Sequence, residues 1–231
     1  MVKNIVWLIF ARANSKRLPK KCYKKLGNYI VLERLVNNAI KSGINKNDLF
    51  LCTSIDNSCD ELVKISKRMG INNIRGDEDY PIKRICTDEA IRKLSIYRNI
   101  VRICGDSPFY SFDLAIKSEK AYREKFNDIF CITNTRKRNF PSGLSIEIYD
   151  RIKFFELLIE KKFLQNEEHM SKISSFTDYK IIDITSTKDF KKMFAYKLTL
   201  DEYKDFISLN KLVNSDFEDK LKKAINEIKF E

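Results

Sequence analysis

A basic segment near the N-terminus carries the residues best suited to chemistry. Five cationic side chains, one serine and one asparagine lie within residues 12–21, directly after an apolar run that is typical of a buried strand. Open α/β proteins bind ligands outside the carboxyl ends of their strands, and guanidinium groups pair bidentately with phosphate oxygens. The spacing of Arg12, Ser15 and Arg17 therefore favours phosphate binding, although most charged runs are simply exposed loops.

Glycine-rich phosphate motifs are absent from the sequence. Neither G-x-x-x-x-G-K-[ST] nor G-x-G-x-x-G occurs, which argues against a P-loop NTPase and against a dinucleotide oxidoreductase. Asn14 tolerates the left-handed backbone conformation that a turn around a phosphate often needs. Backbone N–H groups in such a turn can bind a phosphate without glycine-rich sequence.

Two aspartates, Asp106 and Asp201, follow further predicted strands. Asp106 comes just after the strand predicted over residues 100–104, and Asp201 follows the one predicted over 193–200. Mg²⁺ binds one or two protein carboxylates together with substrate phosphates. We therefore expect these two aspartates to share one Mg²⁺ across a cleft. The simpler interpretation is that each caps the helix that follows it.

The second half of the chain offers two weaker candidates. A Pro-Ser-Gly turn that ends at Gly143 precedes an alternating stretch, 144–149, which predicts a half-exposed strand. Glu147 on this strand could point into a cleft, although most such glutamates are merely exposed. His169 is the only histidine, and a lone histidine beside glutamates is more often a surface residue than a catalyst.

The elements that must position these residues form an alternating pattern. Apolar runs predict strands and periods of 3–4 predict helices, which together indicate an α/β protein with a mainly parallel sheet and helices on both faces. One domain is expected over residues 1–231, with an excursion at about 134–190 that carries acceptor contacts or a dimer surface. The predicted strands are 4–10, 48–53, 100–104, 129–133, 144–149, 179–184 and 193–200, and the helices include 31–40, 62–69, 151–162 and 216–229.

Composition narrows the function classes. The net charge of +12 invites a nucleic-acid interpretation, but lysines are spread along predicted helix faces among acidic residues, so a solvated surface explains them better. The six cysteines form no C-x-x-C pair and are expected to be reduced. No apolar stretch approaches the roughly 20 residues that span a bilayer, and no signal peptide is apparent, so a cytoplasmic location without membrane contact is expected.

In order along the chain, these residues resemble the cytidylyltransferase family of the CMP–sugar-acid synthetases, and most closely the branch named for spore coat polysaccharide biosynthesis protein F. That branch typically begins Q-A-R-x-x-S-x-R-L-P-x-K. The matching segments here are Phe10–Lys21, Leu26-Gly27, Leu32–Leu35, Cys52–Ser54, Ile74–Gly76 with Arg84, Val101–Pro108, Phe140–Leu144 with Glu147, Glu168-His169 and Leu198–Asp201.

The resemblance implies a Rossmann-like, GT-A-like three-layer sandwich that transfers CMP from CTP to an anionic acceptor with Mg²⁺ as cofactor. It implies that Arg12, Arg17, Lys21 and Asp106 are catalytic and that Asp106 and Asp201 bind Mg²⁺. The nucleotide-binding set is Ala11, Arg12, Ala13, Asn14, Ser15, Arg17, Lys21, Thr53, Ser54, Arg75, Arg84 and Asp106. The acceptor-binding set is Asn134, Gly143, Glu147 and His169.

The sequence departs from the family pattern in three places. The frequent glycines at 14 and 20 are Asn14 and Lys20 here, and the usual acidic-apolar stretch before the conserved arginine is Glu78–Lys83. The unusually basic site favours a sugar acid, phosphonate or phosphate ester as acceptor. The expected partners are CTP, this acceptor and a second copy in a homodimer. Two alternatives stay open: a non-catalytic nucleotide- or anion-binding module, and a basic protein associated with nucleic acid.

Overall fold

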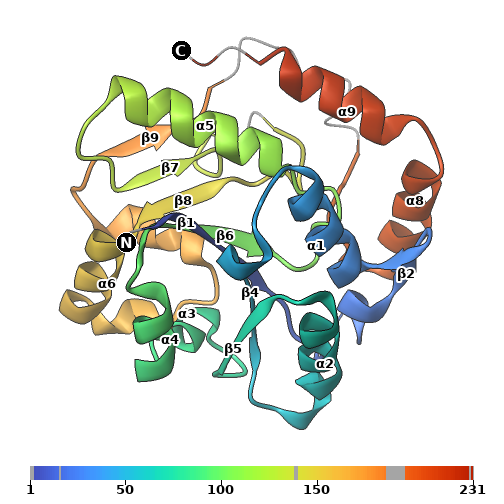
Figure 1. The fold of residues 1–231 in the computed structure, drawn as a ribbon, viewed down its shortest axis with the longest axis horizontal. Coiled ribbons are helices and arrows are strands. Elements are labelled where there is room, and N and C mark those ends of the chain that lie inside the picture. Colours follow the sequence, from blue (N-terminus) through green and yellow to red (C-terminus); the bar gives the residue numbers. More distant parts are fainter. Residues whose placement is uncertain (1–2, 16, 138–139, 186–195, 229, 231) are drawn as a thin grey trace.

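A computed structural model describes residues 3–15, 17–137, 140–185, 196–228 and 230 of the chain. Seven strands form one sheet in the order β5-β4-β1-β6-β8-β7-β9 (Figure 1). Their bounds are β1 Lys3–Phe10, β4 Leu49–Ser54, β5 Asn72–Gly76, β6 Tyr97–Cys104, β7 Cys131–Thr133, β8 Glu147–Asp150 and β9 Ile181–Asp183. Among these strands only β8 runs antiparallel to its neighbours, so the predicted mainly parallel sheet is confirmed.

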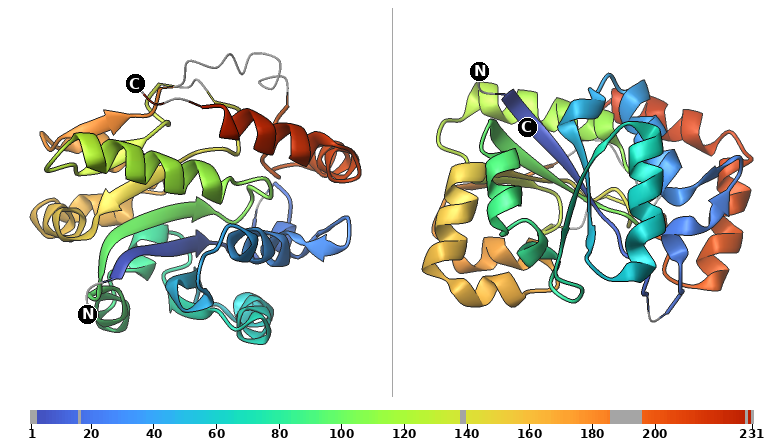
Figure 2. Two further views of the ribbon diagram at one scale, coloured as in Figure 1. Left: turned by 45° about the horizontal axis from the view of Figure 1, so that its top comes forward. Right: turned by 60° about the horizontal axis from the view of Figure 1, so that its bottom comes forward.

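Helices cover both faces of the sheet, as Figure 2 shows in two further views. Strand β1 explains the layering: Trp7 and Ile9 pack into one apolar core and Leu8 and Phe10 into another on the opposite face. The first core includes residues of α1, α2, α5, α8 and α9, and the second includes residues of α3, α4 and α6. The helix bounds are α1 Val31–Lys41, α2 Asp60–Met69, α3 Pro81–Arg84, α4 Asp88–Leu94, α5 Phe112–Lys125, α6 Arg151–Glu160, α8 Tyr203–Val213 and α9 Phe217–Asn226.

Short elements complete the described chain. A two-stranded antiparallel hairpin of β2 Lys25–Leu26 and β3 Tyr29–Ile30 precedes α1. The 3-10 helices are η1 Lys21–Tyr23, η2 Lys46–Asp48, η3 Asn57–Cys59, η4 Lys162–Asn166 and η5 Met170–Phe176. No helix of the described residues has the length and apolar character that would let it cross a membrane.

Local signals place the helix ends well. Gly70 ends α2 with a φ of 73°, the left-handed conformation expected of a C-terminal glycine. Ser111 caps α5, because its hydroxyl accepts the Leu114 N–H at 3.1 Å. All six cysteines are free thiols, as predicted.

Two strand predictions needed correction, and one strand was not predicted. The segment 193–200 is not a strand over its described part, 196–200, because its N–H groups bond to loops: Leu198 to Ser142 and Leu200 to Asp106. The half-exposed strand over 144–149 is the buried β8, which begins only at Glu147. Strand β5 was missed because its Asn-Asn start lacks an apolar run.

A glycine brings the ends of β1 and β6 together. The Gly105 N–H donates to the Phe10 carbonyl at 2.8 Å, and a Cβ at this position would lie 2.6 Å from the Cβ of Ala11. Any larger residue would therefore push the two strand ends apart. The loops after β1 and β6, which hold the predicted site residues, start side by side for this reason.

Candidate functional site

The loop after β1 is a compact turn held by its own backbone. The Ala11 N–H donates to the Cys52 carbonyl at 3.2 Å, and the Ala13 N–H contacts the Cys59 sulfur at 3.4 Å. Two further N–H groups, those of Ser15 and Lys20, donate to the Ala13 carbonyl. Among the described residues of this loop, Lys20 has the left-handed conformation, with a φ of 56°, and Asn14 does not, contrary to the sequence-based expectation.

The centre of the site is an ammonium group between two carboxylates. The Lys21 Nζ lies 2.5 Å from the Asp106 Oδ2 and 3.6 Å from the Asp201 Oδ1. All three side chains are only 15–23% exposed. Burial opposes the charge on Lys21, but the two carboxylates outweigh burial and raise the pKa of Lys21. The predicted metal ligands therefore face one shared cation position.

Asp201 is surrounded by further cations. Arg17 donates to its Oδ1 at 2.9 Å, and the Lys197 Nζ lies 3.0 Å from its Oδ2. Burial alone would raise the pKa of Asp201, but the hydrogen bond from Lys197 and the charges of Lys21 and Arg17 lower it. Asp201 thus remains an ionised carboxylate that bonds to Arg17 of the basic loop.

The capping interpretation of both aspartates is wrong. Helix α8 begins after Glu202, and the backbone N–H groups of Asp201 and Glu202 donate to the Asp205 carboxylate at 3.0 and 2.9 Å. Ser111 fulfils the same role for the helix that follows Asp106. Neither Asp106 nor Asp201 therefore caps a helix.

Loop packing explains why residues far apart in sequence meet here. The Leu200 N–H donates to the Asp106 carbonyl at 2.8 Å, which aligns the segment before α8 with the loop after β6. Gly143 supports the same segment from the other side. It has a φ of 98°, and a Cβ there would lie 2.6 Å from the Leu198 carbonyl oxygen. Gly143 is thus required for packing, whatever its role toward an acceptor.

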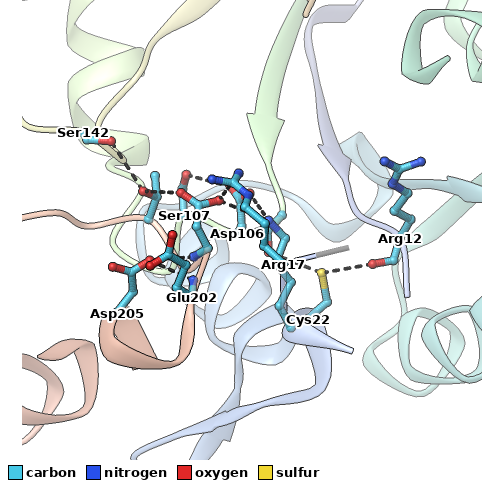
Figure 3. Close-up of polar contacts among 12 residues, drawn as sticks. Arg12, Arg17, Cys22, Asp106, Ser107, Ser142, Glu202 and Asp205 are labelled. Atoms are coloured by element: carbon cyan, nitrogen blue, oxygen red, sulfur yellow. Dashed lines mark hydrogen bonds and ion pairs between the residues drawn. The ribbon is translucent and has the colours of Figure 1, made fainter. Parts of the chain in front are cut away.

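Arg12 points away from this centre. In Figure 3 it stands apart from the pair Arg17 and Asp106, on the other side of Cys22. Its Nη1 donates to the Glu78 carbonyl at 2.8 Å and lies 3.6 Å from the Asp79 carboxylate. The structure therefore separates the basic loop into an inner part, Arg17 and Lys21, and an outer arginine toward β5.

Arg84 is a buried neighbour of Arg12. Its side chain donates to the carbonyls of Asp77 and Glu78, both at 2.8 Å, and burial lowers its pKa. The residue is only 2% exposed. Arg84 thus shapes the acidic loop after β5 that contacts Arg12.

The residues at the end of β4 also serve the structure of the loop that follows it. The Ser54 hydroxyl accepts the Asp56 N–H at 2.9 Å, and Arg75 donates to the carbonyls of Ser54 and Asp56. Hydrogen bonds from Ser58, and to a smaller extent from Asn14, lower the pKa of Asp56, which links this loop to the basic one. The Thr53 hydroxyl is buried without a hydrogen-bond partner among the described residues.

The predicted acceptor residues occupy different environments. The Asn134 amide is fully engaged: it donates to the Leu144 carbonyl and accepts the Ile146 N–H, both at 2.8 Å. His169 is exposed and precedes η5. Neither geometry brings these side chains to the paired aspartates.

Glu147 is buried, contrary to the prediction that it could point into a cleft. Its side chain is 1% exposed, and both oxygens have partners: Arg102 at 2.6 Å and the Tyr149 hydroxyl at 2.8 Å. The glutamate was expected to point into a cleft, but the cross-strand arginine keeps it buried. It therefore has no surface for direct contact with an acceptor in this structure. Sequence reasoning gave Arg102 no role, although a charge inside an apolar central strand is a usable signal.

The sequence model of the cytidylyltransferase family matches residues 6–227. The chain belongs to this family. As a cytidylyltransferase it is a nucleotidyltransferase, so the two non-enzymatic alternatives lose their main support. The basic loop, the Asp106 loop and the Asp201 segment all lie within the matched residues.

Two relatives match most of the cytidylyltransferase chain. An uncharacterized protein of Methanocaldococcus jannaschii is 28% identical over 203 residues, which cover 87% of this chain and 80% of that protein. The spore coat polysaccharide biosynthesis protein SpsF of Bacillus subtilis is 25% identical over 221 residues, or 91% and 87% of the two chains. The sequence resemblance to the SpsF branch is thereby confirmed.

A solved structure shows the same fold. A cytidylyltransferase of Leptospira borgpetersenii superposes with a TM-score of 0.81 at 22% identity, over 97% of this chain and 94% of that one. The predicted Rossmann-like nucleotidyltransferase sandwich is therefore confirmed.

Proposed function

We propose that the protein is a Mg²⁺-dependent cytidylyltransferase that transfers CMP from CTP to a small anionic acceptor. An acceptor oxygen attacks the α-phosphorus, the bond from this phosphorus to the bridging oxygen breaks, and pyrophosphate leaves with the electron pair. One observation carries the proposal: the Lys21 ammonium lies between the carboxylates of Asp106 and Asp201, at 2.5 and 3.6 Å.

The paired carboxylates suit Mg²⁺. Both supply hard oxygen donors, and together they already hold one cationic group. No cluster of three or more acidic, histidine or cysteine side chains that could hold a metal occurs among the described residues, so substrate phosphates would have to supply further ligands. Bound by Asp106 and Asp201, Mg²⁺ would neutralise phosphate charge and orient the triphosphate.

The basic side chains explain the rest of nucleotide binding. The Arg17 side chain is 63% exposed and bonded only at its tip to Asp201, so it can exchange this carboxylate for a phosphate with little rearrangement. Lys21 can turn from the carboxylates to a phosphate once the metal takes its place. Arg12, on the β5 side, is placed to contact a more distant part of the nucleotide. Such chemistry needs positioning and charge neutralisation more than a covalent group.

One relative supports a role in glycan synthesis. SpsF of Bacillus subtilis is named for spore coat polysaccharide biosynthesis. We infer that this chain likewise activates a precursor of a glycan, with a carboxylate, phosphonate or phosphate group that suits the basic site. The reaction needs no nucleic acid and no membrane contact.

Nucleotide binding tests the proposal directly. Thermal unfolding is measured with CTP, UTP, ATP and GTP, each with and without Mg²⁺, because selective binding raises apparent stability by mass action. We expect CTP with Mg²⁺ to give the largest increase in Tm. Pyrophosphate release from CTP is then assayed with sugar acids, phosphonates and phosphate esters. Equal shifts for all four nucleotides would contradict the cytidylyl specificity.

Two other results would favour the alternatives. Tight CTP binding without pyrophosphate release from any acceptor class would support a non-catalytic nucleotide-binding module. A steep dependence of oligonucleotide affinity on salt would support a nucleic-acid protein.

A homodimer is part of the same proposal. Large apolar side chains are exposed within the 134–190 excursion, including Ile159 at 70% and Phe163 at 52%. Such side chains are costly to leave in water when they lie together. Light scattering should give a dimer mass, and Ile159→Lys should shift it toward the monomer, whereas Ile207→Lys on α8 is the matched control.

A further inference from the structure

One face of the central strand β6 carries a stripe of partly exposed side chains. Strand β6 lies between β1 and β8, and its alternate residues Val101, Ile103 and Gly105 are buried. The residues between them, Arg102 and Cys104, are partly exposed, and so is Asp106 just beyond the strand. Successive side chains of a strand point to opposite faces, so the partly exposed residues share one face.

The stripe begins at the proposed metal ligand and ends at an arginine. Asp106 at one end is 23% exposed and Arg102 at the other is 16% exposed, measured on the side chains. A strand advances about 3.3 Å per residue, so four residues separate the two backbones by at most roughly 13 Å. A molecule of monosaccharide size can reach both side chains at once.

Side chains of the neighbouring strand β8 hold Arg102 in place. Its Nη1 donates to the Glu147 Oε2 at 2.6 Å, and the other carboxylate oxygen accepts the Tyr149 hydroxyl at 2.8 Å. Tyr149 also contacts the Met170 carbonyl at 3.2 Å. Glu147 is therefore a fixed counter-ion. It keeps the guanidinium charged and oriented in a largely dry environment, where a charge-assisted hydrogen bond is strong.

The rest of the guanidinium is available to a ligand. Of its five N–H donors, the described contacts engage only those of Nη1, and none of its nitrogens is a buried atom without a partner. The charged cluster thus leaves the Nε and Nη2 side of Arg102 without a protein partner among the described residues. A guanidinium anchored on one side and unpaired on the other is suited to bind an anion.

We infer that Arg102 binds an anionic group of the acceptor and that Glu147 is its positioning residue. This inference rests on the proposed cytidylyl transfer, and it adds a restriction on the acceptor. The attacking oxygen must lie at the Asp106 end of the stripe, whereas the anion lies at the Arg102 end. The acceptor therefore carries a carboxylate or phosphate that can reach Arg102 while its attacking oxygen lies at the Asp106 end.

Calorimetric titration with defined probes tests the inference. The protein is saturated with Mg²⁺ and α,β-methylene-CTP, a CTP analogue that cannot release pyrophosphate, and is then titrated with glucuronate, glucose and inorganic phosphate. Glucuronate and glucose differ only at the end of the sugar far from the anomeric hydroxyl. We expect glucuronate to bind at least 10-fold more tightly than glucose and phosphate binding to be measurable.

Variants assign the effect to Arg102. Removing the arginine alone leaves Glu147 buried without its partner, so the main variant is the double change Arg102→Met with Glu147→Gln, which removes both charges. It should weaken glucuronate and phosphate binding at least 10-fold and leave glucose and the CTP analogue within about 2-fold. Arg102→Lys, which keeps the charge but not the fork geometry, should fall between the two. Unchanged Tm of each variant shows that the fold survives.

The outcomes separate this inference from the proposed function. If the CTP analogue fails to bind the unaltered protein, both are overturned. If the analogue binds but glucuronate and phosphate bind no better than glucose, or bind the double variant equally well, the assignment of Arg102 is overturned and the cytidylyltransferase proposal stands. Glucuronate binding without phosphate binding still supports the inference, provided that it depends on Arg102.

Discussion

Two ion-paired clusters, one on β6 and one just beyond its end, differ in how readily a ligand can replace one of their charged partners. Around Asp106, Lys21 and Asp201 pair through partly exposed side chains, and Arg17 joins them from solvent. Around Glu147, Arg102 and Tyr149 pair with a carboxylate that is 1% exposed. Arg102 of one cluster and Asp106 of the other are only four residues apart along the chain, which is two repeats of the strand pleat.

The difference lies in what can replace each partner. The carboxylates of the first cluster are 15–23% exposed, so a metal can replace their cations at small cost. The buried carboxylate has no such substitute, because losing its partner leaves an uncompensated charge in a low-dielectric environment. The first cluster is therefore suited to binding and release, and the second to holding a side chain in one position.

Asp106→Asn gives the largest expected effect. The amide keeps the shape of the side chain but removes the charge that would bind Mg²⁺, so we expect turnover to fall by about 10²–10⁴-fold, in the range of a lost electrostatic group at a reaction centre. The Tm should change little, because the pair is partly exposed. Pyrophosphate release and thermal unfolding measure both. Asp219→Asn, an exposed aspartate on α9, is the matched control, and equal activity of the two variants would remove Asp106 from the reaction.

Glu147→Ala should cost more stability than any change in the exposed cluster. Removing one partner of a buried ion pair typically destabilises a protein by about 3–5 kcal/mol. Urea unfolding measures the free energy of unfolding. Glu147→Gln keeps the side-chain volume and one acceptor oxygen, which can bond to Arg102 or to Tyr149, and should cost less. A loss below about 1 kcal/mol for Glu147→Ala would show that this cluster is as replaceable as the other.

Lys21→Met tests whether the exposed cluster is exchangeable. The ammonium competes with a metal for Asp106 and Asp201, so its removal should raise the affinity for Mn²⁺ in the absence of nucleotide by about 10-fold, which equals about 1.4 kcal/mol. The same variant should bind CTP more weakly, because one phosphate contact is lost. Electron paramagnetic resonance of free Mn²⁺ measures the first effect. Unchanged Mn²⁺ affinity would mean that Lys21 does not occupy the metal position.

Acid unfolding gives the smallest effect. The pKa of Asp201 is lowered in the folded protein, so its pairing contributes stability above the unfolded pKa of about 3.9, and this contribution is lost as the pH falls through the folded pKa. The difference in unfolding free energy between the unaltered protein and Asp201→Asn should be under about 1 kcal/mol at pH 7, because water reaches this partly exposed pair and screens it. It should shrink below pH 4. A difference that grows on acidification would contradict the assigned ion pairs.

The fold was largely predictable because it depends on short-range patterns. Apolar runs located β1, β4 and β6, and Gly70 and Ser111 marked helix ends by local chemistry. The misses have a common cause. Strand β5 and the 196–200 segment are decided by neighbours distant in sequence, which supply or withhold the pairing strand.

The site was predicted less completely. The motif order identified the basic loop and both aspartates as members of one site. It could not distinguish residues that face a ligand from residues that build loops, because both types are polar and follow strands. Ser54, Arg75, Arg84 and Asn134 bond to backbone groups in the structure, while Arg102 inside a strand points to a partly open face.

The amino-acid sequence by itself determined the layered α/β fold, the family and the charged groups at the carboxyl ends of the strands, because hydrophobic period and motif order are local properties of the chain. Only the tertiary structure decided which charges pair. Lys21 forms an ion pair with Asp201, 180 positions away, and Glu147 of β8 forms one with Arg102 of the neighbouring strand β6. These contacts depend on strand order and loop packing, and they set burial, which decides whether an ion pair can exchange with a ligand or must stay closed.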